Sequence, residues 1–81
     1  MRTATTTASL DGLRPGARVV IRNVDGPAPL VRRLAEMGIR PDALVTALHR
    51  TAGGGRVVDV AGARIALARS VLRSISTEPS S

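Results

Sequence analysis

A chain of 81 residues is long enough for one small domain, in which little surface can be buried and each core side chain matters. Phe, Tyr, Trp and Cys are absent, which excludes disulfides, thiolate metal sites, cysteine catalysis and aromatic platforms for peptides or single-stranded nucleic acid. The net charge is +6, and all twelve basic residues are Arg. They are spread from Arg2 to Arg73, which favours a solvated surface and GC-rich coding over a nucleic-acid interface.

The sequence predicts a cytoplasmic domain with two loose ends. No apolar run approaches the ~18 residues of a membrane span. Residues 1–9 carry one positive charge without the apolar core of a signal peptide. Residues 1–8 and 77–81 are small, polar and unpatterned, so we expect disordered tails around a domain that covers 9–76.

The first half of the domain predicts one strand and one helix. Turns around 11–12 and 14–16 precede a β-branched run over 18–24 that is typical of a strand. Prolines follow at positions suited to the first turn of a helix, which we expect over about 28–37.

The end of this helix has a detailed signature. Leu34 and Met37 lie on its apolar face, and Gly38 can adopt the left-handed conformation that ends a helix. With Gly38 in that position, Ile39 and Leu34 form the contact expected in a Schellman motif, and Pro41 prevents the helix from resuming. We expect Met37 and Ile39 in the core rather than in an exposed docking patch.

The second half predicts a further strand, a hairpin and a closing strand. The expected elements are a strand over 43–50, a flexible loop at Gly53–Gly55, strands over 56–60 and 64–67 joined by a tight turn at Gly62, a helical turn near 69–73, and a short strand over 73–76. Five short strands and one helix indicate a mainly β fold, a small and strongly bent barrel that leaves no long free edge.

Residues for catalysis or metal binding are sparse. His49 is the only histidine, and the six acidic residues are scattered, so no metal site is expected. Gly53–Gly55 lacks the Lys-Ser/Thr ending of a phosphate-binding loop. Nothing in the sequence places His49 beside a nucleophile, and we expect no enzymatic activity and no cofactor.

Four stretches together carry a resemblance to a known family. They are LDGLRPG at 10–16, RLAEMGIRP at 33–41, VAGARIAL at 60–67, and Ile75. In their order and spacing the chain resembles the FeoA family, small cytoplasmic proteins that accompany the FeoB ferrous-iron transporter. The resemblance implies an SH3-like barrel of five strands.

The chain departs from the family pattern at three positions. Asp42 stands where the family usually has Gly, Ala68 where Arg is common, and Leu72 where Ala is usual. Asp also tolerates a turn, so the first change is mild. The second weakens the inference that a contact made by that Arg is retained.

The resemblance implies an accessory protein that binds the cytosolic part of a FeoB-type transporter and modulates it. Arg33 and Arg40 are the candidates to meet an acidic surface of that partner, with Arg32 beside them. An ordinary surface pair with Glu36 also explains Arg32, and packing of its stem on the barrel also explains Arg33.

Two other functions stay open at this point. One is a basic small barrel that binds RNA or the ribosome, for which the signature is an affinity that falls steeply with salt. The other is a free-standing relative of the C-terminal domain of DtxR-type repressors, which has the same fold and a similar motif. Nucleic acid is therefore the second choice of partner after the transporter, and the sequence does not fix the oligomeric state.

Overall fold

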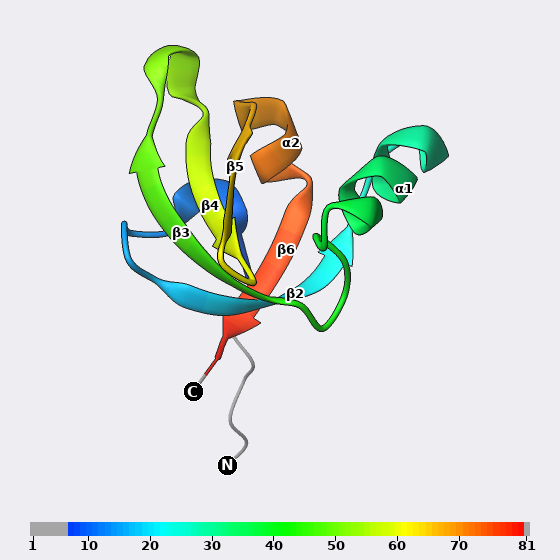
Figure 1. Cartoon of the computed structure of the whole chain (residues 1–81), viewed down its shortest axis with the longest axis horizontal. Coiled ribbons are helices and arrows are strands. Elements are labelled where there is room, and N and C mark those ends of the chain that lie inside the picture. Colours follow the sequence, from blue (N-terminus) through cyan, green and yellow to red (C-terminus); the bar gives the residue numbers. More distant parts are fainter. Residues whose placement is uncertain (1–6, 81) are drawn as a thin grey trace.

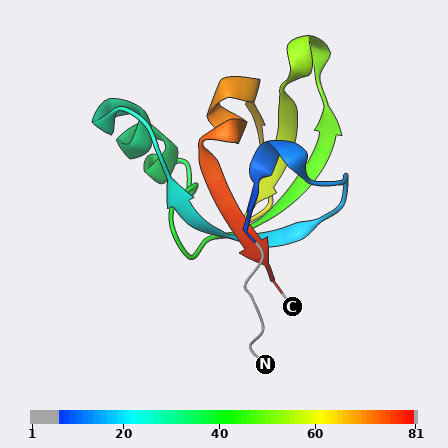
Figure 2. The same cartoon turned by 180° about the vertical axis from the view of Figure 1, so that it is seen from behind.

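Six antiparallel strands form one bent sheet in the computed structural model, which describes residues 7–80 (Figure 1). The order across the sheet is β1-β6-β2-β3-β4-β5. The elements are β1 (Ala8–Ser9), the 3-10 helix η1 (Leu10–Gly12), β2 (Arg18–Val24), α1 (Ala28–Glu36), β3 (Leu44–Arg50), the 3-10 helix η2 (Ala52–Gly54), β4 (Arg56–Val60), β5 (Ala63–Leu67), α2 (Arg69–Arg73) and β6 (Ile75–Pro79). Seen from behind, η1 lies beside α2, whereas α1 stands apart from both (Figure 2).

The predicted fold class is confirmed, because the chain forms a mainly β, SH3-like small barrel with a short helix. Strands β2 and β4 have the predicted bounds, and α1 ends one residue before the predicted end. The sheet has one strand more than the five expected, since the short β1 pairs with β6. The expected flexible loop of Gly53–Gly55 is in large part the 3-10 helix η2.

The prediction of a disordered tail from residue 77 is wrong for residues 77–79, which belong to β6. Thr77 is only 1% exposed because β6 lies between β1 and β2. Its hydroxyl donates a hydrogen bond of 2.8 Å to the Ala8 carbonyl, so the buried polar group is satisfied. Ala8, expected in the N-terminal tail, thereby belongs to the sheet; positions 1–6 and 81 lie outside the described residues.

The core is aliphatic throughout and comes from alternate strand positions and one face of each helix. Its buried members are Leu10, Val19, Ile21, Val24, Leu34, Ile39, Val45, Ala47, Val58, Val60, Leu67, Leu72 and Ile75. The expectation of a buried Met37 is wrong, since its side chain is 38% exposed. Met37 is the C-cap of α1, and the chain turns at Gly38 (φ +93°) directly after it. Ile39, fully buried as expected, fills the core instead.

The predicted end of α1 is confirmed in detail. Gly38 has φ +93°, and the amide of Ile39 donates to the Leu34 carbonyl at 2.9 Å. The amide of Gly38 donates to the Ala35 carbonyl, also at 2.9 Å, which completes a Schellman motif. A Cβ at Gly38 would lie 3.0 Å from Cγ1 of Val60, so this glycine also allows the close approach of α1 to the barrel.

Two other residues adopt a positive φ without being glycine. Asp42 has φ +74°, which explains why the FeoA pattern usually places glycine there. Its carboxylate accepts a 2.9 Å hydrogen bond from Arg22. Ala61 has φ +52° and precedes Gly62, so both central residues of the β4–β5 turn have a positive φ. The predicted tight turn is confirmed, although Asn would suit position 61 better than Ala.

Candidate functional site

A groove lies where the loop after α1 meets the β4–β5 turn. Its volume is about 460 Å³, and it is lined by Gly38, Arg40, Pro41, Asp42, Ala43, Leu44, Val60 and Ala61. Leu44 is 44% exposed and is, with Met37, one of the exposed large hydrophobic residues within the described range. The groove therefore combines an accessible apolar side chain with charged residues in its wall.

Of the candidate arginines, only Arg40 belongs to this groove. Arg33 lines a second, smaller hollow of about 290 Å³ together with prolines 27 and 29 and Leu30. Arg32 is exposed on α1, and the expected ion pair with Glu36 is not formed. The three arginines are thus not gathered at one point, but none has a side-chain hydrogen bond or ion pair within residues 7–80.

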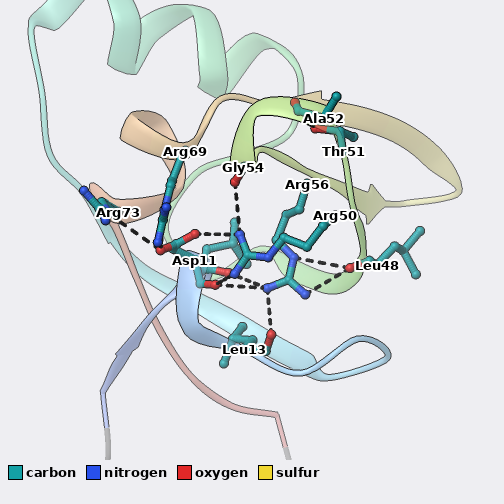
Figure 3. Close-up of polar contacts among 11 residues, drawn as sticks. Asp11, Leu13, Leu48, Arg50, Thr51, Ala52, Gly54, Arg56, Arg69 and Arg73 are labelled. Atoms are coloured by element: carbon teal, nitrogen blue, oxygen red, sulfur yellow. Dashed lines mark hydrogen bonds and ion pairs between the residues drawn. The ribbon is translucent and has the colours of Figure 1, made fainter.

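A second polar surface centres on Asp11, a residue that the sequence analysis treated only as part of a turn. Its Oδ1 accepts a hydrogen bond of 2.7 Å from Nη1 of Arg50 on β3. Its Oδ2 lies 3.5 Å from Nε of Arg69 and 3.7 Å from Nε of Arg73, both on α2 (Figure 3). The hydrogen bond from Arg50 lowers the pKa of Asp11, burial opposes this, and the charges of Arg50 and Arg69 lower it further.

A buried guanidinium lies next to this carboxylate and fixes η1 in place. Arg56 is 1% exposed and donates hydrogen bonds to the carbonyls of Leu10, Asp11, Leu13 and Leu48. These acceptors satisfy its donors, although burial, assisted by the nearby Arg50 charge, lowers its pKa. Arg56 therefore ties η1 and the residue after it to strands β3 and β4.

The sequence did not predict this cluster, because its arginines are dispersed along the chain. Four of them, Arg50, Arg56, Arg69 and Arg73, converge on Asp11 or its backbone in the folded chain. The only local signal was the spacing of Arg69 and Arg73, which are four residues apart on the predicted helical turn and so share one face.

Residues 7–80 contain no group of three or more His, Cys, Asp or Glu side chains that could hold a metal ion. His49 is exposed on β3. Within that range, too, no helix has both the length and the apolar character needed to cross a membrane.

The chain matches one protein family and is similar in fold to several solved structures. A model of the FeoA domain matches residues 8–79. The crystal structure of an iron uptake regulatory protein (FeoA) is similar with a TM-score of 0.82 and 22% identity, over 90% of this chain and 97% of that chain. The solution structure of the FeoA protein from Chlorobium tepidum has a TM-score of 0.84 and 21% identity, over 91% of this chain and 71% of that chain.

The same fold also occurs inside a longer chain. A manganese-dependent transcriptional repressor is similar with a TM-score of 0.82 and 20% identity, over 95% of this chain but only 44% of the repressor. At such identities these three structures show a shared fold alone. Among curated proteins, no sequence matches this chain.

Proposed function

The chain belongs to the FeoA domain family, and from this premise we propose that it binds the cytosolic domain of a FeoB-type ferrous-iron transporter and modulates it. The family acts in ferrous iron transport and is a non-catalytic accessory family. The observation that carries the proposal is the match of the family over residues 8–79, nearly the whole chain.

The groove is the surface to which we assign this contact. Leu44 supplies exposed apolar surface beside the hollow, and many protein interfaces combine an apolar centre with a polar rim. Arg40 lines the groove, and its guanidinium has no hydrogen-bond partner in the described part of the chain. Arg40 would meet a carboxylate of the partner, and Arg33, with Arg32 beside it, would extend the contact along α1. Electrostatic complementarity of this kind increases the association rate more than it increases the affinity.

Binding of the purified chain to the cytosolic domain of the transporter tests this proposal. We expect Arg40→Glu to weaken binding at least tenfold and Arg33→Glu to weaken it less. Arg14→Glu is the matched control, because Arg14 is also exposed and without a side-chain partner among residues 7–80 but lies in the turn before β2. Intact binding by the double variant R33E/R40E would refute the placement, and absence of binding by the wild-type chain would refute the function.

Structural likeness to a transcriptional repressor favours one second candidate, a regulatory domain that acts by contact with another protein. A wild-type chain that does not bind the transporter domain would favour this candidate. Total RNA added as a competitor to the same experiment tests the nucleic-acid alternative. Capture of the transporter domain in the presence of RNA supports the accessory function. Recovery of RNA alone would assign the basic surface to nucleic acid.

A further inference from the structure

The cluster around Asp11 holds more positive charge than the fold needs. Three guanidiniums, those of Arg50, Arg69 and Arg73, meet one carboxylate, which leaves two positive charges without a counter-ion among the described residues. Arg50 and Arg56 account for most of the internal contacts, since they bind the backbone or side chain of Asp11 and other carbonyls. The surplus therefore lies on α2, at Arg69 and Arg73.

These two side chains are only loosely engaged. Their Nε atoms lie 3.5 Å and 3.7 Å from Oδ2 of Asp11, whereas a strong charge-assisted hydrogen bond measures about 2.7–2.9 Å. The side chains of Arg69 and Arg73 are 53% and 62% exposed. No hydrogen bond from their terminal nitrogens is formed within residues 7–80. Each guanidinium keeps a free face that suits a carboxylate.

The spacing of Arg69 and Arg73 on α2 determines which partner could contact both side chains. Arg69 and Arg73 stand one helical turn apart on the same face of α2, which places their Cβ atoms about 5–6 Å apart. The stem of Arg69 packs over η2, since a Cβ at Gly54 would lie 3.3 Å from its Cδ. Figure 3 shows both side chains extending from α2 to the same carboxylate. Two acidic residues four apart on another helix have the same spacing.

We propose that Arg69 and Arg73 form a docking site for an acidic helical segment of a protein partner, with one carboxylate of that segment on each guanidinium. The chain has no aromatic side chain on which a base could stack, which disfavours single-stranded nucleic acid as the partner. The site is separate from the groove, because the β4–β5 turn lies at one end of β5 and α2 follows the other. The proposal goes beyond the proposed function.

Titration of the whole chain with a defined peptide tests this site. The probe is an alanine-based helical peptide, blocked at both ends, with two pairs of Glu spaced four residues apart. Followed by NMR, the Nε–H signals of Arg69 and Arg73 should shift most, and R69E/R73E should lower the affinity at least tenfold. R14E/R64E serves as the matched control and should change it less than twofold, because both arginines are exposed, have no side-chain partner among residues 7–80 and undergo the same change in charge.

Further variants separate a specific site from diffuse charge. The same peptide with Gln for Glu should not bind, and a peptide with Glu two residues apart should bind several-fold more weakly. R69K/R73K keeps both positive charges but lacks the planar guanidinium that binds a carboxylate through two hydrogen bonds, so this variant should lose part of the affinity for the peptide. If R69E/R73E does not melt like the wild type, R69Q/R73Q replaces it.

Three results would overturn the proposal. They are equal losses in R69E/R73E and R14E/R64E, full affinity in R69K/R73K, and tighter binding of an RNA oligonucleotide of the same charge as the peptide. The transporter is not part of this experiment. A failed peptide titration therefore leaves the proposed function standing, and a failed transporter assay leaves this site standing.

Discussion

Replacement of the buried Arg56 by Met should destabilise the fold severely. Met keeps an apolar stem but leaves four carbonyl acceptors, those of Leu10, Asp11, Leu13 and Leu48, without their donor. A hydrogen bond to a charged group contributes about 1.5–3 kcal/mol, so the gross loss is roughly 6–12 kcal/mol. Burying a charge costs several kcal/mol, and the absence of this cost in the variant offsets part of the loss. We expect a net loss of about 2–4 kcal/mol.

Such a loss is a large part of the total, because a domain of this size is stable by roughly 4–12 kcal/mol. It corresponds to a fall in Tm of about 10–25 °C. Melting followed by far-UV circular dichroism measures it, and Arg64→Met is the matched control. Arg64 is exposed on β5 and has no side-chain partner in the range that the structure describes, so its variant should stay within about 0.5 kcal/mol. A Tm of R56M within about 4 °C of the wild type would refute the reasoning.

The remaining predictions concern one carboxylate and two turns. Because the pKa of Asp11 is lowered in the folded chain, its contribution to the free energy of unfolding is present above the ordinary value of 3.8 and is lost as pH falls through the lower folded value. The difference in stability between wild type and Asp11→Asn should therefore shrink in melts below pH 3.8, and parallel pH curves would contradict this. Gly38→Ala and Gly16→Ala both place Ala at a φ above +90°, at a cost of about 1 kcal/mol, but only the first also meets Val60 at 3.0 Å. Urea unfolding should thus show the larger loss for Gly38→Ala, and equal losses would exclude the close contact as a cause. Ala61→Asn should raise stability by about 0.5–1 kcal/mol in the same assay, whereas a loss would show that the turn does not need a residue suited to its φ of +52°.

What the sequence predicted correctly depends on neighbours in the chain. The stop of α1 needs only Gly38, the residues it caps and Pro41, so the motif could be recognised before folding. Strand β2 has β-branched residues over most of its length, so this strand could also be predicted from a short stretch of sequence. The end of β6 could not be predicted in this way. Thr77 and the two residues after it have no strand pattern of their own, and they form a strand because they pair with β1 and β2 from the other end of the chain.

The polar cluster could not be predicted for the same reason. Arg69 lies 58 residues from Asp11 in the sequence, and no periodicity joins them. Nor does any local pattern distinguish the buried Arg56 from the exposed Arg64, since both lie at the start of short strands, Arg56 as the first residue of β4 and Arg64 as the second of β5. Helical spacing did place Arg33 on the surface, but it does not say what an exposed arginine meets. Its role as a partner contact therefore stays a prediction.

The attachment of β1 has a mechanical consequence. Ala8 pairs with Thr77 and Ser9 with Ser76, and the chain runs from this two-residue ladder directly into η1. Tension applied to both ends of the domain would load an antiparallel pair from one side and open its bonds one after another, like a zipper. The next segment drawn out would be η1, and with it the single carboxylate that holds Arg50, Arg69 and Arg73 together. A pull on the termini would thus release the arginines of α2, although no force acts on that helix directly.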